Sequence, residues 1–426
     1  MIAQSRGEIS ASLHAPISGT VVALEMRPAP HRLGAPTLSV VINSDGRDEP
    51  FTLPQRSDSF QSLERLELCE FIESGGIVGL GGAAFPTSAK LLQANAAADM
   101  HLLLNGAECE PYISCDHLLM RERAADVVLG AQILMHAIGA NRCTIAIEDD
   151  TPDAERALSA AVKSCAEQRI EVVIVPSIYP AGGERQLIAA VAGVEVPHDG
   201  WPTDIGLVCQ NVGTAAAVAR WWRDGEPLIS RIVTVTGEGV GNPCNLEVRL
   251  GTPISSIVAD CGGYTSDAVR LIMGGSMMGT PLPHDDLPIV KATNCIVAAS
   301  PHDLHPRGME MPCIRCGDCS DVCPAILLPQ QLHWYLQPPN FDALESLGLM
   351  DCIECGCCDY VCPSKIPLAE RFRDAKPALA VKLAARGDAS AARSRFEARN
   401  TRLAEIEADR RAKLEEKRRQ LLNRKP

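Results

Sequence analysis

The sequence contains no apolar run long enough to cross a bilayer. The best candidate, residues 124–140, is interrupted by Asp126, Gln132 and His136, and its spacing predicts an amphipathic helix. The first residues, MIAQSRGE, lack the apolar core of a secretory signal peptide. We therefore expect a protein that neither spans a membrane nor is exported through a cleaved signal.

Cysteine, in contrast, is abundant, with 18 residues in the chain. In an exported protein this number would suggest disulfides. Without a signal peptide, and with many of the cysteines at short regular spacings, it indicates metal ligation. We expect a reducing compartment, so the protein is predicted to lie in the cytosol or to face it.

Charge is unevenly distributed along the 426 residues, whose net charge is −13. From Arg371 onward the chain has 17 Lys and Arg but only 8 Asp and Glu. An acidic body with a basic tail argues against general nucleic-acid binding. The tail could contact an acidic partner or an anionic membrane surface. A solvated helix or a disordered end is an equally weighted alternative.

The length predicts several domains, and the sequence pattern divides the chain into five segments. We expect a multidomain α/β protein with a β-rich module at 1–54, an α/β domain at 55–228, a small α+β module of ubiquitin-like size at 229–300, a cysteine domain at 301–372, and a charged helical or disordered tail at 373–426. Within the first module, residues 12–24 are predicted to form two short strands around a tight turn.

The α/β prediction rests on apolar strand-like segments that alternate with helix-like ones. Strands are expected at 101–105, 143–148, 170–176 and 205–210, and helices at 63–74, 117–139, 154–168, 184–192 and 214–223. Such alternation is typical of a largely parallel sheet. In the following module, residues 231–237 and 244–250 are predicted to be paired strands.

The strongest motif is C-x₂-C-x₂-C-x₃-C-P, which begins at Cys313 and recurs 39 residues later at Cys352. This spacing is that of two-cluster ferredoxins, in which the fourth cysteine of each motif ligates the other cluster. Zinc sites usually use two CxxC pairs and need neither the third cysteine nor the CP ending. The predicted ligands are Cys313, Cys316, Cys319 and Cys362 for one [4Fe–4S] cluster, and Cys352, Cys355, Cys358 and Cys323 for the other.

The remaining cysteines have no ligand spacing. Cys357 lies beside Cys358 and is predicted to be a small buried residue, with ligand exchange as a minor alternative. The other nine are expected to be reduced thiols in or near the cores.

A glycine-rich segment, Gly79 to Lys90, is predicted to be a bare loop that leads into a helix. Backbone amides in such a loop can approach a phosphate, helped by the helix N-terminus. The segment formally matches GxGxxA, but a predicted helix precedes it where a dinucleotide-binding fold requires a strand. A purely structural turn is therefore an open alternative.

Three further loops follow predicted strands: Asn105–Tyr112, Tyr179–Arg185 and Gln210–Thr214. The carboxyl ends of strands in α/β sheets are where ligands bind. Glu108 and Glu110 could accept hydrogen bonds from a flavin or from ribose hydroxyls, or they could be a solvated surface pair. Together with the glycine-rich loop, these segments favour a nucleotide or flavin site.

These motifs, in this order, resemble RnfC, the family of C subunits of the Rnf (Rsx) ion-translocating electron-transport complex. The glycine-rich loop is also similar to the flavin-binding loop of the NADH-oxidising flavoprotein subunit of respiratory complex I. The resemblance covers about residues 1–370. It rests on HAPISGTV at 14–21, NGAECEPYI at 105–113, YPAGGERQL at 179–187, QNVGT at 210–214, and the tandem cysteine motif followed by LPQQL at 328–332.

The resemblance implies a partial lipoyl-like barrel sandwich at 1–54, a complex-I-flavoprotein-like domain at 55–228, an SLBB module at 229–300 and a two-cluster bacterial-ferredoxin-type domain at 301–372. It implies noncovalent FMN near Gly79, Gly81, Gly82, Lys90, Asn105, Glu108, Asn211 and Thr214. It also implies NADH near Glu110 and Glu184.

The sequence departs from the family pattern at several positions. The complex I loop has Arg and Gly where this chain has Leu80 and Ala84, and an Asp where it has Ala107; the last change is expected to weaken or re-pose flavin or nicotinamide contacts. The first half of the barrel module is expected to be missing, through a late start codon or a truncation. No lysine occupies the turn where a lipoyl carrier has one, so a carrier role is not expected.

The resemblance implies an enzyme subunit of a translocase, peripheral on the cytoplasmic face of the bacterial inner membrane. Hydride from NADH would pass to FMN, and single electrons would move through the two clusters to or from the membrane subunits of the Rnf complex. Ferredoxin is a further candidate partner, and no catalytic acid or base is expected. The alternatives are a stand-alone reductase resembling the cobalamin reductase PduS, and a ferredoxin-like relay whose α/β domain is only a docking scaffold.

Overall fold

The computed structural model describes residues 1–7, 9–31, 34–50, 59–94, 99–165, 167–198, 200–304 and 308–422. Its contacts divide the chain into two compact units. The first comprises Met1–Glu310 and Cys355–Cys357, and the second Met311–Glu354 and Cys358–Pro426.

The N-terminal module is an antiparallel pair of strands, β1 (Gly19–Pro28) and β2 (Pro36–Ser44). Of the two strands predicted within 12–24, the second is confirmed as the start of β1, and the first is wrong. The segment before Gly19 contributes only an isolated bridge between Leu13 and Ala3. Gly19 begins β1. A Cβ there would lie 2.1 Å from the carbonyl oxygen of Asn43, so close strand approach explains the glycine.

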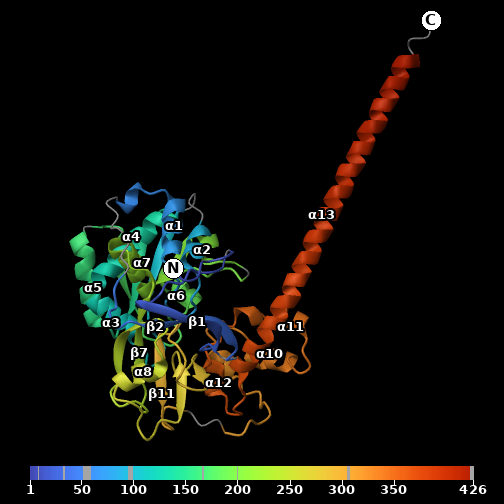
Figure 1. Ribbon diagram of the computed structural model, residues 1–426. Coiled ribbons are helices and arrows are strands. Elements are labelled where there is room, and N and C mark those ends of the chain that lie inside the picture. Colours follow the sequence, from blue (N-terminus) through green and yellow to red (C-terminus); the bar gives the residue numbers. More distant parts are fainter. Residues whose placement is uncertain are drawn as a thin grey trace. The chain divides into compact units, whose positions relative to one another are not determined.

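The α/β domain follows, with the predicted alternation of helices and strands (Figure 1). Its elements are η1 (Phe60–Ser62), α1 (Arg65–Ser74), α2 (Thr87–Leu92), β3 (Met100–Gly106), α3 (Cys115–Glu122), α4 (Ala124–Ile138), β4 (Ala140–Glu148), α5 (Pro152–Cys165), β5 (Ile170–Val175), α6 (Glu184–Ala192), η2 (Pro202–Ile205), β6 (Leu207–Asn211) and α7 (Val212–Asp224). The helix predicted over 117–139 is two helices, because the backbone leaves the helical conformation at Arg123.

The four strands of this domain form a parallel sheet in the order β5-β4-β3-β6. One face carries the larger core, in which α1, α4, α5 and α7 pack on residues such as Leu102 and Ile145. The other face is covered by α6, whose Leu187 and Ile188 pack on Leu103. Burial on both faces explains why the strands are continuously apolar. The chain moves from β3 to β4 and β5 on one side and returns to β6 on the other, so β3 and β6 flank a topological switch point.

The next module is a five-stranded sheet in the order β10-β9-β11-β7-β8. Its elements are β7 (Ser230–Thr236), β8 (Cys244–Arg249), α8 (Ile254–Asp260), β9 (Arg270–Met273), β10 (Thr280–Leu282) and β11 (Cys295–Ala299). The predicted pairing of β7 with β8 is confirmed and is antiparallel. Helix α8 contributes Ile254, Ile257 and Val258 to the core of the module.

The second unit contains the cysteine motifs apart from Cys355–Cys357, and the backbone of the two motifs repeats with the sequence. Its elements are α9 (Asp318–Asp321), α10 (Pro329–Tyr335), α11 (Phe341–Ser346), η3 (Leu349–Asp351), α12 (Cys357–Val361) and α13 (Leu368–Leu422). Arg315 and Glu354, which are equivalent in the two motifs, both have positive φ (+58° and +59°), as do Ile326 and Lys365 (+53° and +54°). The two motifs therefore fold into two copies of one loop.

The tail is helical as far as Leu422, which confirms one of the two predicted alternatives (Figure 1). Helix α13 begins at Leu368, inside the segment expected to be the cysteine domain, and Phe372 and Leu379 are buried in the core of the second unit. Within the described parts of the chain, no helix combines the length and apolar character that a membrane span requires.

Candidate functional site

The predicted ligand loops of the α/β domain meet at the switch point of its sheet. Asn105 and Asn211 lie at the ends of β3 and β6, and these two residues are partners in the strand register. The loop after β3 contains Glu108 and Glu110. The loop predicted at 210–214 is wrong, because α7 begins directly after β6 and these residues are the end of the strand and the first turn of the helix. The carboxyl ends of adjacent strands therefore bring two of the four predicted segments side by side.

The glycine-rich loop is closed by two backbone hydrogen bonds at its base. The N–H of Gly79 donates to the carbonyl oxygen of Phe85 (2.8 Å), and the N–H of Thr87 donates to that of Ile77 (3.2 Å). Thr214, which is fully buried in the first turn of α7, accepts a bond from the N–H of Leu80 at 2.9 Å. The loop is thereby fixed to the switch point.

The glycines of this loop leave open space where side chains would lie. A Cβ at Gly79 or Gly81 would meet only ordinary contacts of 3.6 Å or more, and one at Gly82 would meet nothing within 4 Å. Gly82 has φ of +106°, which favours glycine, whereas Ala84 adopts φ of +50° with a Cβ. The loop has an open backbone face that a flat ligand could cover.

The two asparagines organise the neighbouring loops. The side-chain amide of Asn105 donates to the carbonyl oxygen of Gly182 (2.8 Å), and its oxygen accepts from the N–H of Ala107 (3.0 Å). Asn211 caps α7 by accepting from the N–H of Gly213 (2.8 Å) and donates to Asp116 (2.5 Å). The predicted loops are thus joined by these side chains.

Glu108 is partly buried and caps the start of α3. Its carboxylate accepts bonds from the N–H groups of Asp116 and His117 at 3.0–3.1 Å, and the thiol of Cys115 lies 3.2 Å away. Burial, followed by the nearby charge of Asp116, raises the pKa of Glu108 well above its ordinary value. Burial likewise raises the pKa of Asp116. Two carboxyl groups so close together favour sharing a proton over ionising together.

The two residues expected near NADH differ in their surroundings. Glu110 accepts bonds from the N–H groups of Met277 (2.6 Å) and Met278 (2.9 Å), so it joins the loop after β3 to the module that follows the α/β domain. Glu184 begins α6 and lies 2.5 Å from the ammonium group of Lys90. The structure therefore brings together Lys90 and Glu184, which are 94 residues apart in the sequence.

Several buried polar atoms near these loops have no hydrogen-bond partner among the described residues. They are Thr87 Oγ1 at the start of α2, Glu148 Oε1 at the end of β4, Gln186 Oε1 in the first turn of α6, and Gln210 Nε2 near the end of β6. Such groups are costly unless they are satisfied. All four positions lie at the carboxyl end of the sheet or in the first turn of a helix, and this placement suits a polar ligand there.

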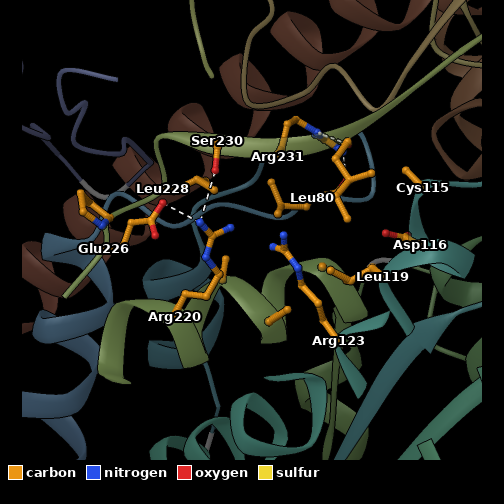
Figure 2. Close-up of a pocket in the computed structure, with 15 residues that line it drawn as sticks. Leu80, Cys115, Asp116, Leu119, Arg123, Arg220, Glu226, Leu228, Ser230 and Arg231 are labelled. Atoms are coloured by element: carbon orange, nitrogen blue, oxygen red, sulfur yellow. Dashed lines mark hydrogen bonds and ion pairs between the residues drawn. The ribbon is translucent and has the colours of Figure 1, made fainter. Parts of the chain in front are cut away.

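Arg231, a buried cation next to the loop, was not among the residues predicted from the sequence. It lies in β7, is 5% exposed, and donates to the carbonyl oxygen of Leu80 at 3.0 Å and to that of Lys291. Figure 2 shows Arg231 and Leu80 on one side of a cavity that Cys115, Asp116 and Leu119 also line. A single arginine in a strand carries no motif, so no sequence signal marked it.

On the opposite side of this cavity, Arg123 and Arg220 extend toward each other (Figure 2). Arg220 pairs with Glu226 (2.5 Å) and with Glu247 (2.8 Å), and Arg123 also pairs with Glu247. Burial alone would raise the pKa of Glu247, but the two arginines lower it to about 2. This network fastens α4 and α7 to β8.

In the second unit, one cavity is lined by Cys313, Cys316 and Cys319 of the first motif and by Cys362 of the second. These are the four residues predicted to hold one cluster, drawn from both copies of the repeat. Gly317 has φ of +96° and turns the chain between the second and third cysteines. Four thiols around one cavity fit the donor set of a [4Fe–4S] cluster.

The other predicted ligands are Cys323 and Cys352, which are half-buried, and Cys355 and Cys358, which are buried. Their assignment to the second cluster stays a prediction. Cys357 is half-buried. Of the nine cysteines expected in or near cores, six are buried and two half-buried, but Cys244 is exposed.

Four segments of the chain match known protein families. Residues 1–47 match the RnfC barrel sandwich hybrid domain, 72–220 the Nuo51 FMN-binding domain, 232–281 the SLBB domain, and 312–366 the 4Fe-4S dicluster domain. Together with the fold, these matches define a chain that joins an FMN-binding domain of the complex I type to a dicluster domain.

The curated relatives are more specific. The chain is 47% identical over 402 residues to the C subunit of the ion-translocating oxidoreductase complex of Pseudomonas aeruginosa, covering 94% of this chain and 51% of that protein. It is 44% identical over 403 residues to the corresponding protein of Cronobacter sakazakii, covering 95% of this chain and 51% of that protein. It is 43% identical over 400 residues to that of Vibrio cholerae, covering 93% of this chain and 51% of that protein. The chain spans about half the length of the curated relatives it matches. Over that span, it belongs to the RnfC family of ion-translocating oxidoreductase subunits.

Solved structures agree on the fold. The chain is similar to the crystal structure of an NAD⁺-reducing [NiFe]-hydrogenase in the H₂-reduced state, with a TM-score of 0.51, 18% identity, and coverage of 75% of this chain and 61% of that one. The crystal structure in the air-oxidised state gives a TM-score of 0.50 and 18% identity, with coverage of 73% of this chain and 61% of that one. At this identity the similarity concerns the fold alone.

Proposed function

We propose that this chain passes electrons between NADH, FMN and two [4Fe–4S] clusters, and from there to or from the membrane subunits of an Rnf-type complex. The observation that carries the proposal is the union, in one RnfC-family chain, of an FMN-binding domain and a dicluster domain. The relatives are named as one subunit of a complex, and this supports membership of a multi-subunit assembly.

In this proposal FMN is held at the glycine-rich loop, by Gly79, Gly81, Gly82 and Lys90, and by Asn105, Glu108, Asn211 and Thr214 at the switch point. The open backbone face of the loop and the unpartnered polar atoms around it support this assignment. Glu110 and Glu184 are assigned to NADH. When bound, FMN accepts a pair of electrons and releases them singly, and the clusters carry single electrons.

The chain's own residues position and tune these groups. Thr214 and Arg231 hold the backbone of the glycine-rich loop from its two sides. Burial raises the pKa of Glu108 and of Asp116, which favours a neutral carboxyl group over two negative charges beside the loop. No side chain is required to act as a general acid or base.

The two sets of cysteines are assigned to the clusters as the motif predicts: Cys313, Cys316, Cys319 and Cys362, and Cys352, Cys355, Cys358 and Cys323. The cavity lined by the first set supports that half of the assignment. The proposed location is the cytoplasmic face of the bacterial inner membrane, with the chain bound there through its partner subunits. Ferredoxin is proposed as an exchange partner of the complex.

The test is an anaerobic absorbance titration of the cluster-reconstituted chain with FMN and then NADH. Bleaching of both the flavin and the iron–sulfur bands by NADH is the expected result. If dithionite bleaches the clusters and NADH bleaches nothing, the chain is a relay and the flavin assignment fails. Co-purification with integral membrane subunits is expected; a stand-alone reductase would purify without them.

A further inference from the structure

Two cysteines that belong to neither motif lie next to each other in the module after the α/β domain. Cys244 begins β8 and Cys261 directly follows α8. Their sulfur atoms are 3.1 Å apart, although the residues are separated by 17 positions in the sequence. A disulfide has an S–S distance of about 2 Å, so the sulfurs would need to approach by only about 1 Å.

The two sulfur atoms lie close together because main-chain hydrogen bonds fix the positions of both cysteines. Cys244 is paired with Val235 in the β7–β8 ladder. The N–H of Cys261 donates to the carbonyl oxygen of Ile257 (3.1 Å), and the carbonyl oxygen of Cys261 accepts from the N–H of Asn242 (2.7 Å). Both cysteines are therefore held by main-chain hydrogen bonds, and the two segments that carry them are bonded to each other.

The two thiols differ in access. Cys244 is exposed, whereas Cys261 is fully buried in the core of the module. Burial, and then the hydrogen bond with Cys244, raise the pKa of Cys261 to about 12. A reagent from solution can therefore reach only Cys244. Among the described residues, the one group of three metal-type donors within 4.8 Å of each other is Glu108, Cys115 and Asp116, so the pair has no third ligand at this distance.

We propose that Cys244 and Cys261 form a reversible intramolecular disulfide when the protein meets a low-molecular-weight disulfide as the oxidant. The thiolate of Cys244 attacks the oxidant, forms a mixed disulfide and releases one thiol. Cys261 then attacks the sulfur of Cys244, loses its proton and displaces the second thiol. The protein loses two electrons and two protons, and both are recovered in the two thiols released.

The bond would connect the start of β8 to the end of α8 and close the chain between them into a loop. Such a link restrains the unfolded chain and so stabilises the module. The disulfide involves none of the eight motif cysteines and no part of the proposed electron path. The proposal therefore holds even if that path is wrong.

The sequence makes the bond directly detectable. Arg231, Arg249 and Arg270 are the only Lys or Arg residues from 231 to 270, so trypsin releases residues 232–249, with Cys244 as their one cysteine, and residues 250–270, with Cys261 as theirs. The cluster-loaded full chain is treated anaerobically with excess oxidised glutathione, unfolded in guanidinium with an alkylating reagent present so that buried thiols also react, digested without reductant and analysed by mass spectrometry.

We expect most of both peptides to be recovered as one linked pair, which dithiothreitol separates. Cys244→Ser should lower the yield of the pair by at least about tenfold and leave Cys261 alkylated. Cys165→Ser, at a half-buried cysteine of α5, is the matched control and should leave the pair unchanged. Recovery of both cysteines alkylated, of Cys244 as a lasting glutathione adduct, or of Cys244 linked to another cysteine would overturn the proposal.

Discussion

At the scale of single residues, Ala84 carries a conformational cost that a glycine would avoid. Its φ of +50° lies in the left-handed region, where a Cβ costs about 1–2 kcal/mol. We predict that Ala84→Gly raises the free energy of unfolding by about 1 kcal/mol, after subtraction of the entropy that glycine adds to the unfolded chain. Urea unfolding of the full chain, followed by tryptophan fluorescence, measures the change.

The matched control is the neighbouring Ala83→Gly. Ala83 is not among the residues with positive φ, so the same substitution there should only add unfolded-state entropy and cost about 0.5–1 kcal/mol. If both variants are destabilised equally, the left-handed conformation of Ala84 does not store strain.

Glu108 makes stability depend on pH. Its pKa is raised by burial and by Asp116, so the folded chain keeps a proton that the unfolded chain releases above its ordinary pKa of 4.5. The free energy of unfolding should therefore fall as the pH rises from 4.5 toward the raised pKa. Glu108→Gln cannot titrate and should reduce this fall by at least about 1.4 kcal/mol, the equivalent of one pKa unit.

Urea unfolding at pH 5 and pH 8 tests this prediction. Glu122→Gln, on the exposed side of the same helix α3, is the control and should keep the wild-type pH dependence. An unchanged slope in Glu108→Gln would mean that another group carries the pH dependence.

At the scale of elements, the contact between α7 and the glycine-rich loop should govern flavin binding. The hydroxyl of Thr214 accepts the N–H of Leu80 in a fully buried position. Thr214→Val preserves the shape but leaves that N–H unsatisfied, which costs about 1–3 kcal/mol. We expect the Kd for FMN, measured by quenching of flavin fluorescence, to rise by about tenfold or more.

Thr214→Ser keeps the hydroxyl and should bind FMN within about twofold of the wild type. If the valine variant binds FMN normally, the hydrogen bond from Leu80 does not position the loop. The two variants thus separate the role of the hydroxyl from that of the packing.

At the scale of the whole molecule, the structure shows where the tail can be removed. Leu379 is fully buried, and Lys382 and Arg386 pair with Asp342 and Glu345 of α11. A truncation before these residues would damage the core of the second unit. A chain of residues 1–386 should keep its iron content while losing the exposed remainder of α13.

We predict that this shortened chain binds NADH and FMN as the full chain does. If the basic tail contributes to membrane association, the truncation should weaken binding to anionic vesicles and abolish its salt dependence. Sedimentation with vesicles at low and high salt measures this effect. Equal sedimentation of both chains would exclude the tail as a membrane contact.

The sequence alone predicted the domain order, the parallel sheet and the presence of a dicluster domain. Each depends on short-range spacing: the alternation of apolar segments, and three cysteines of each motif that must reach one cluster from one loop. The glycine-rich loop was recognised for the same reason, because its backbone must stay bare. By contrast, the first of the two strands expected within 12–24 is only an isolated bridge at Leu13, since neighbours in the fold decide whether a short apolar segment pairs.

Tertiary structure alone decided which distant groups meet. Arg231 joins the glycine-rich loop from a strand 151 residues away, Glu110 reaches Met277, and Cys244 meets Cys261. Arg231 and the two cysteines have no local signature, and the motif that contains Glu110 does not reveal its partner, since a buried cation, a cap or a thiol pair is defined by neighbours that only packing supplies. The spacing of ligands in a motif is local, so the sequence predicts which cofactors the chain could bind. The positions of its buried charges and paired thiols depend on contacts that form only in the folded chain.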